Sequence, residues 1–180
     1  MAARGSAKRT PLLVRDLVTE ATVLLRHEIQ SNNVALVLDF SGPPTHVIGD
    51  RTELHQVIVN LALNAIQAMV QTEKVQRVLM IGVERPAPDR VLCAIDDTGP
   101  GIGPQHFDRV FDSFFTTKEK GTGIGLSISR RIIEVHGGTL KADHISKLGG
   151  ARFFFTLPTV VGALDHAPLA AEVAAMAPKV

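Results

Sequence analysis

The clearest helical pattern covers residues 51–71, RTELHQVIVNLALNAIQAMVQ, where apolar residues recur at helical spacing without an intervening glycine or proline. Asp50 stands just before it, where its side chain can cap the first turn. Residues 11–29, PLLVRDLVTEATVLLRHEI, show a second pattern of this kind. Residues 123–136, GIGLSISRRIIEVH, show a third, which ends at two glycines. The sequence therefore predicts three helices.

Six shorter apolar runs, rich in β-branched residues, predict strands at residues 34–40, 45–50, 77–84, 90–97, 138–143 and 151–158. The prolines and aspartate of RPAPD, between the third and fourth runs, favour a hairpin. Each helix is followed by two strands, which favours a two-layer α/β sandwich with a mixed sheet packed on three helices. GTGIGL does not follow a strand and no GxxxxGK[ST] occurs, so both common phosphate-binding signatures are missing.

Length and composition favour a single domain. The chain has 180 residues, of which 45% are hydrophobic, enough to build one core. We expect residues 11–158 to form the domain, preceded by a residual linker at 1–10. Residues 159–180 are alanine-rich and interrupted by proline, which predicts a mostly disordered tail.

Charge argues against several classes of partner. Nineteen basic and eighteen acidic residues leave a formal charge of +1, so we expect neither nucleic acid nor a membrane surface to be bound. No apolar run is long enough to span a bilayer, and the first residues lack the apolar middle of a signal peptide. The single cysteine, Cys93, stands in an apolar run, which indicates a buried core residue in a reducing, cytoplasmic compartment. The seven histidines show no zinc-ligand spacing.

Two asparagines within the central predicted helix are candidates for metal binding. Asn60 and Asn64 are four residues apart and so share one helix face. Asparagine is a poor helix former, and the flanking sequence is otherwise apolar. Neutral amide oxygens offered together suit Mg²⁺, which keeps several waters and also contacts nucleotide phosphates. Two merely solvated side chains are the alternative.

Two glycine clusters follow this helix. Asp97 ends a predicted strand just before TGPGI, where a ligand can approach the backbone closely. A carboxylate that accepts a hydrogen bond from a ligand amine rejects analogues that lack this donor, although a turn-forming aspartate is common. The second cluster is formed by Gly121, Gly123 and Gly125, at the start of a helix whose first amides can receive phosphate.

In this order, these blocks resemble the catalytic ATP-binding domain of sensor histidine kinases, with a Bergerat-type fold, within the superfamily of type II topoisomerase and mismatch-repair ATPases. The resemblance covers Leu12 to Pro158. HQVIVNLALNAIQAM is similar to the N box of that family, and DDTGPGI to its G1 box. FDSFFTTK is similar to its F box, and GTGIGLSISRRIIEVHGG to its G2 box.

The resemblance implies a role for each of these positions. Asn64 and Asn60 would hold Mg²⁺ against the triphosphate, and Asp97 would accept the adenine amine. Residues 103–125 would form an ATP lid, anchored to the core by Phe111, Phe114 and Phe115. Lys118 would reach the terminal phosphates, with Lys120 as its competitor, and Thr116, Thr117 and Thr122 could add hydroxyl contacts. The full set expected to contact nucleotide is Asn60, Asn64, Asp97, Gly99, Gly101, Ile102, Phe111, Lys118, Thr122, Gly123, Ile124, Gly125 and Leu126, of which Asn60, Asn64 and Lys118 are the expected catalytic residues.

Two departures from the family pattern concern this site. Ala151 stands where many relatives have a threonine near adenine, which puts a water-mediated side-chain contact there in doubt. AIQAM follows Asn64 where some kinases carry a basic residue directed toward the phosphates. Charge neutralisation would then depend on Mg²⁺ and the lid.

The resemblance implies transfer of the ATP γ-phosphoryl group to a histidine. His27, in HEIQSN, is not expected to be the acceptor, because only thirty-two residues separate it from Asn60 and leave no room for a dimerisation hairpin. We therefore expect the acceptor on an upstream dimerisation and phosphotransfer domain, and a response regulator as the downstream partner. We expect the present domain to be monomeric in isolation, and its parent protein could be membrane-anchored.

One alternative is an ATP-hydrolysing switch. The topoisomerase branch activates water with a glutamate one helical turn before its metal asparagine, and Asn60 stands there in this chain. A module without nucleotide binding is the third possibility.

Overall fold

The structure is a computed structural model that describes residues 9–72, 76–116, 121, 123–143 and 146–161. Along the chain, its elements are β1 (Thr10–Leu13), α1 (Val14–Leu24), α2 (Arg26–Ser31), β2 (Val34–Asp39), β3 (His46–Gly49), α3 (Arg51–Val70), β4 (Arg77–Ala87), β5 (Arg90–Asp97), the 3-10 helix η1 (Pro104–Arg109), α4 (Gly125–Val135), β6 (Thr139–Asp143) and β7 (Arg152–Pro158).

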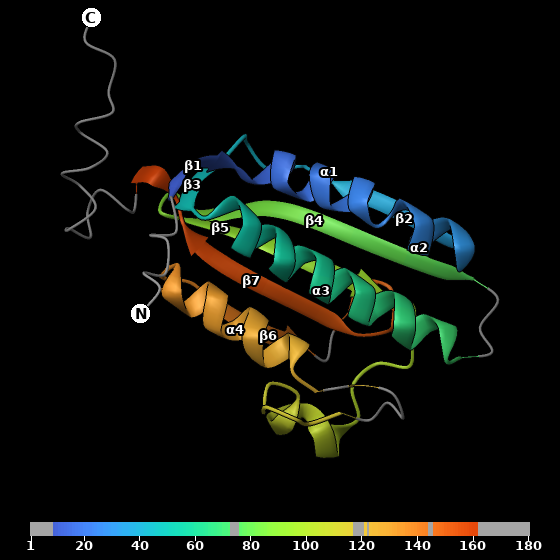
Figure 1. Cartoon of the computed structure of the whole chain (residues 1–180). Coiled ribbons are helices and arrows are strands. Elements are labelled where there is room, and N and C mark those ends of the chain that lie inside the picture. The colour runs from blue at the N-terminus through green and yellow to red at the C-terminus, as the bar shows by residue number, and fades with distance from the viewer. Residues whose placement is uncertain (1–8, 73–75, 117–120, 122, 144–145, 162–180) are drawn as a thin grey trace, which may run out of the picture.

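Five strands form one mixed sheet in the order β2-β4-β5-β7-β6. β2 runs parallel to β4, whereas β4–β5, β5–β7 and β6–β7 are antiparallel. The predicted hairpin between residues 77–84 and 90–97 is confirmed, with β4 extending to Ala87. Helices α1, α3 and α4 lie on one side of this sheet and give two layers (Figure 1). The predicted α/β sandwich with a mixed sheet is thus confirmed.

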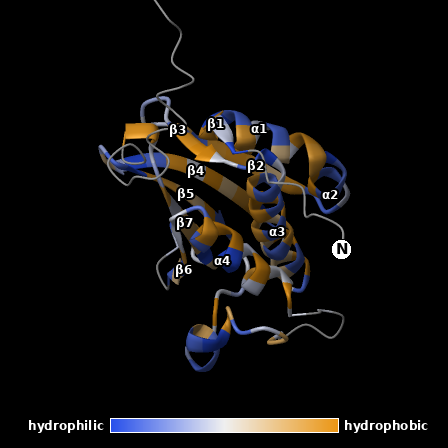
Figure 2. Ribbon diagram, turned by 60° about the vertical axis from the view of Figure 1, so that its left-hand side comes forward, coloured by the Kyte–Doolittle hydropathy of each residue, from blue (hydrophilic) through white to orange (hydrophobic). Residues whose placement is uncertain are grey.

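The core fills the space between these layers. Alternate residues of β5 and β7, including Cys93, Ile95, Phe153 and Phe155, are buried in one apolar cluster with the inner face of α3. This follows from the two-residue period of a strand, which directs every second side chain to the same face. Long stretches of the strands are accordingly orange, the colour of hydrophobic residues, in Figure 2. Among the described residues, no helix is long and apolar enough to cross a membrane.

The N-terminal part of the chain departs from the sequence prediction. Residues 10–13 were expected to lie in the first helix or linker, but they form β1, which pairs antiparallel with β3 in a separate two-stranded sheet. β3 therefore does not pair with β2, the strand that precedes it in the chain. The predicted helix at 11–29 is also divided, because α1 ends at Leu24 and α2 begins at Arg26.

Two polar contacts fix the start of α3. The Asp50 carboxylate accepts a hydrogen bond from the Glu53 N–H at 3.0 Å, as the sequence predicts for an N-cap. The Asp50 N–H donates to His136 Nε2 at 3.0 Å, while Nδ1 of the same ring lies 2.8 Å from the Ile132 carbonyl. His136 is buried and thereby joins the beginning of α3 to the end of α4. These contacts fix the start of α3 relative to the end of α4.

The chain remains in contact with the domain just beyond β7. Thr159 is buried, and its N–H and hydroxyl donate to the carbonyls of Asp89 and Pro88 at 3.0 Å each. The domain boundaries and the tail remain predictions, because residues 162–180 lie outside the described part of the chain.

Candidate functional site

A cleft of about 330 Å³ opens between α3, the end of β5, the start of α4 and the segment after β5. Its described lining comprises Asn60, Leu63, Asn64, Gln67, Ala68, Gln71, Asp97, Pro100, Gly101, Ile102, Gly103, His106, Val110, Phe115, Thr116, Gly121, Gly123, Gly125, Leu126, Ala151 and Phe153. Apolar and polar side chains alternate around this space. Such a lining suits a ligand with a flat apolar part and a polar remainder.

Helix α3 contributes one polar stripe to the cleft. Asn60, Asn64, Gln67 and Gln71 follow each other at intervals of three or four residues, so one face of the helix presents all four amides. The sequence prediction included the asparagines and missed the two glutamines. Continuing the same helical spacing toward the C-terminus would have found them.

Asp97, at the end of β5, has a carboxylate of fixed orientation. Only 2% of the residue is exposed. Its Oδ1 accepts hydrogen bonds from the Gly99 N–H at 2.7 Å and the Ala151 N–H at 3.1 Å. The Asp97 N–H donates in turn to the Ala151 carbonyl at 3.1 Å. A buried acidic acceptor at the wall of a partly apolar cleft can select a ligand that offers an N–H donor.

Glycines let the backbone approach this carboxylate closely. A Cβ added at Gly150 would overlap both the carbonyl oxygen and Oδ1 of Asp97. Gly101 has φ +79°, a backbone conformation that strongly favours glycine. Ala151 lies at the predicted departure from the family pattern and contributes its backbone N–H, which needs no particular side chain.

The other end of the cleft is formed by the start of α4. Gly123, Gly125 and Leu126 line it, and the first amides of an α-helix are available to an anion. Asn60 faces this end, with Nδ2 donating to the buried Ser129 hydroxyl of α4 at 3.4 Å. This contact, which the sequence did not reveal, orients the Asn60 amide toward the junction of α3 and α4.

The segment after β5 lines one side of the cleft, and in Figures 1 and 2 part of it extends beyond the two layers. The rings of Phe111 and Phe153, a residue of β7, form an edge-to-face pair with 6.1 Å between their centroids. The rings of Phe115 and His106 pack with 5.4 Å between their centroids. Phe114 is 77% exposed and has φ +68°, so the prediction that it anchors the segment to the core is wrong. Its N–H donates to the Gly123 carbonyl at 2.8 Å, while its side chain lies in solvent.

Most predicted nucleotide contacts meet in this cleft. Those that line it are Asn60, Asn64, Asp97, Gly101, Ile102, Gly123, Gly125 and Leu126. Three others act from behind the lining: Gly99 bonds to Asp97, Phe111 packs on Phe153, and Ile124 precedes α4. Lys118, Lys120, Thr117 and Thr122 lie outside the described residues.

Comparison with known proteins assigns this architecture to a family. The model of the histidine kinase-, DNA gyrase B- and HSP90-like ATPases matches residues 49–161, which include the whole described lining of the cleft. The chain belongs to this family. Within the family, its sequence is 38% identical over 156 residues to the sensor protein FixL of Bradyrhizobium diazoefficiens, covering 87% of this chain and 30% of FixL. It is 36% identical over 149 residues to the sensor histidine kinase TmoS of Ectopseudomonas mendocina, covering 82% of this chain and 15% of TmoS.

Solved structures of the family show the same fold. The catalytic domain of histidine kinase ThkA superposes with a TM-score of 0.74 at 32% identity, over 84% of this chain and 95% of that one. ThkA in complex with the response regulator protein TrrA gives a TM-score of 0.71 at 29% identity, over 84% and 42% of the two chains. The chain is therefore an ATP-binding catalytic domain of the sensor histidine kinase type, and these kinases are protein-histidine kinases. It spans less than a third of the length of FixL.

The described lining of the cleft contains few acidic side chains. Asp97 is the one carboxylate among the described lining residues, and no glutamate is found there. The described part of the chain also holds no group of three or more His, Cys, Asp or Glu side chains placed to bind a metal. Asn60 and Asn64, the metal ligands expected from the sequence, both line the cleft.

Proposed function

We propose that this domain binds ATP together with Mg²⁺ in the cleft and transfers the γ-phosphoryl group to a histidine on a separate dimerisation and phosphoacceptor domain. A response regulator would then receive the phosphoryl group. This activity needs parts beyond the present chain, because the chain covers only a fraction of its relatives.

The observation that carries this proposal is the arrangement of Asp97 relative to α3 and α4. At one end of the cleft, two backbone N–H groups hold a buried carboxylate that can accept the adenine amine. The two asparagines and the start of α4 lie along the same cleft, where a triphosphate would extend. A single nucleotide can therefore contact both ends.

The donor set suits Mg²⁺. Asn64 and Asn60 offer neutral amide oxygens one helical turn apart, and Mg²⁺ accepts few protein ligands beside phosphate oxygens and water. When bound, Mg²⁺ would neutralise charge on the transferring phosphate. The Ser129 hydroxyl would keep the Asn60 amide in place, and the first amides of α4 would bind phosphate oxygens. Lys118 reaching the terminal phosphates, and closure of residues 103–125 over the nucleotide, remain predictions.

The absence of a glutamate from the described lining favours kinase activity over hydrolysis. Activation of water requires a general base within hydrogen-bond reach, and Asn60 has no carboxylate to provide it. With Asn60 at the position where such a base would stand, the γ-phosphoryl group would be available for an acceptor brought by another domain.

The comparisons also support the proposed downstream partner. The structural relative ThkA has been solved with the response regulator protein TrrA, which supports a response regulator as the downstream partner here. The proposed location is the cytoplasmic side of the parent protein, a reducing compartment in which the free thiol of Cys93 would persist.

A phosphotransfer assay tests the proposal. The domain would be mixed with the histidine-bearing domain of its parent protein, Mg²⁺ and γ-labelled ATP. We expect label on that domain that is stable in base and labile in acid, and none with the Asp97→Asn variant. Release of free phosphate well above background in the absence of the acceptor would contradict the kinase proposal and favour a switch ATPase.

A further inference from the structure

Strand β5 ends in two consecutive aspartates, each only 2% exposed. Because side chains of a strand alternate between its faces, Asp96 and Asp97 point to opposite sides of the sheet. Asp97 lines the cleft, whereas Asp96 is not among the cleft residues. A carboxylate this deeply buried is costly unless it is paired, and the proposed function gives Asp96 no task.

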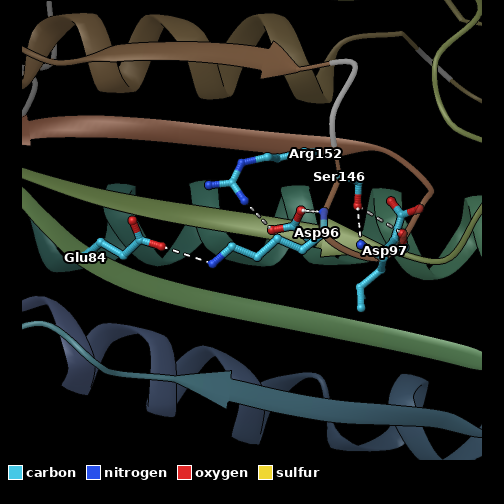
Figure 3. A network of polar contacts seen from close by, with 7 residues as sticks. Glu84, Asp96, Asp97, Ser146 and Arg152 are labelled. Atoms are coloured by element: carbon cyan, nitrogen blue, oxygen red, sulfur yellow. Dashed lines mark hydrogen bonds and ion pairs between the residues drawn. The ribbon is translucent and has the colours of Figure 1, made fainter.

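The partners of Asp96 come from the segment that leads into β7. Its Oδ2 accepts from Arg152 Nη1 at 3.0 Å, and its Oδ1 accepts from the backbone N–H of Lys147 at 3.0 Å. The Arg152 side chain is 13% exposed, so the ion pair is largely shielded from water. Lys147 Nζ continues the network to Glu84 of β4 at 3.2 Å, at the surface (Figure 3).

The same segment forms the wall of the cleft at Asp97. Ala151, next to Arg152, donates the N–H that holds Asp97 Oδ1, and Gly150 lies so close to Asp97 that a Cβ would not fit. Ser146 Oγ reaches the Asp97 carbonyl at 3.5 Å and accepts from the Leu148 N–H at 3.1 Å. Asp96 therefore bonds this segment at Lys147 and at Arg152. The residues next to these two, Ser146 and Ala151 with Gly150, contact Asp97.

We propose that Asp96, through Arg152 and the Lys147 backbone, is a positioning residue that sets the orientation of the Asp97 carboxylate and thereby selectivity for a purine with an exocyclic amine. This inference rests on the proposed nucleotide binding. Asp96 does not touch the nucleotide and acts from the other face of the sheet. The backbone of residues 146–151 is the connection between the two aspartates.

Selectivity separates this role from a purely structural one. Replacing Asp96 by asparagine keeps its shape but removes the charge opposite Arg152, which should loosen the segment that carries the Ala151 N–H. A poorly oriented Asp97 would lose most of its hydrogen bond to the amine of ATP. The affinity for purine riboside triphosphate, which has no exocyclic amine, would fall little. Lower stability alone would change both affinities equally.

The experiment is a calorimetric titration of wild type and Asp96→Asn with Mg²⁺ and each of these two nucleotides, at a temperature where circular dichroism shows both proteins folded. We expect ATP binding to weaken about tenfold in the variant, at the lower end of what loss of supporting contacts costs at other sites. Binding of purine riboside triphosphate should change much less. Equal losses for both nucleotides, or none, would overturn the proposal.

Lys147→Ala is the matched control, because it removes the surface pair with Glu84 and keeps the backbone N–H on Asp96. It should bind both nucleotides like the wild type. If Asp96→Asn fails to fold, Arg152→Lys keeps the charge with a different geometry and should reduce the preference for ATP in the same direction.

Amide hydrogen exchange tests the positioning role of Asp96 in the absence of nucleotide. We expect the Ala151 and Gly99 amides to exchange about tenfold faster in Asp96→Asn than in wild type, because both are bonded to Asp97. Unchanged exchange at both amides would overturn the proposal. Failure of the wild type to bind ATP would contradict the proposed function instead, so the two failures can be told apart.

Discussion

The two sides of the cleft are built differently. The floor, formed by α3, the end of β5 and the start of β7, includes the buried residues Asp97, Ala151 and Phe153, and Asp97 and Ala151 are hydrogen-bonded to each other in both directions. The opposite side, residues 103–116, has a short 3-10 helix and is mostly exposed or partly buried: Val110 is its one buried residue, and Phe111 and Phe115 pack against the core. In the proposed function, base recognition would belong to the first side, and closure of the predicted lid over the phosphates would involve the second.

The largest expected effect contrasts two phenylalanines from these sides. Phe155 of β7 is buried in the core, whereas Phe114 is mostly exposed. We expect Phe155→Ala to lower the free energy of unfolding by about 3–5 kcal/mol, the cost of removing a buried aromatic ring. Phe114→Ala should change it by less than about 0.5 kcal/mol. Urea denaturation measures both, and equal losses would mean that residues 103–116 are as firmly packed as the floor.

Next in size is Asp97→Asn, which tests base recognition on the floor of the cleft. The amide oxygen of asparagine can still accept from the Gly99 and Ala151 N–H groups, so the fold should be retained. The amide N–H₂ would then face the adenine amine, donor against donor, and ATP affinity should fall about 100-fold. Calorimetry measures this, with Glu20→Gln on the surface of α1 as a control that should bind normally. Unchanged affinity would show that adenine does not bind at Asp97.

A smaller effect is expected at the centre of the sheet at alkaline pH. Burial raises the pKa of the Cys93 thiol from 9.0 to about 12. Above pH 9 the unfolded chain loses this proton while the folded domain keeps it, so the contribution to stability is complete below pH 9 and is lost as pH rises toward 12. The free energy of unfolding should fall by about 1 kcal/mol at pH 10 from this group alone.

Urea denaturation of wild type and Cys93→Ala at pH 7 and pH 10 measures the contribution of the Cys93 thiol to the pH dependence of the free energy of unfolding. The variant should lack this part of the pH dependence, since its cavity weakens the domain equally at both pH values. Identical pH dependence in the two proteins would show that the thiol is accessible to water.

The smallest expected effect concerns the junction of the two sides. Ser129→Ala removes the acceptor for the Asn60 amide, at a hydrogen bond of 3.4 Å. Affinity for Mg-ATP should fall about threefold, as for one weak hydrogen bond, while affinity for ATP without Mg²⁺ should stay the same. A loss that is equal with and without Mg²⁺ would show that Ser129 does not act through the metal ligand.

The sequence predicted the parts of this molecule that depend on local pattern. Helix α3, its cap Asp50, the β4–β5 hairpin and most cleft residues follow from periodicity and from motifs that lie close together in the chain. It did not predict β1, because the pairing of Thr10–Leu13 with His46–Gly49 is a long-range contact and the same apolar residues also fit a helix. Phe114 was misjudged for a related reason: an aromatic residue is normally buried, but this one has a left-handed backbone conformation and lies in solvent.

In the proposed function, one cleft binds ATP through Asp97 and Mg²⁺ through the asparagines of α3. Calorimetric titration of wild type and Asn64→Ala with a non-hydrolysable ATP analogue, with and without Mg²⁺, tests both parts together. We predict that Mg²⁺ strengthens binding to the wild type and has no effect on the variant, which should still bind the metal-free nucleotide. Mg²⁺-dependent binding that persists in Asn64→Ala would show that Asn64 does not hold the metal, and no binding by the wild type in either condition would show that the cleft is not an ATP site.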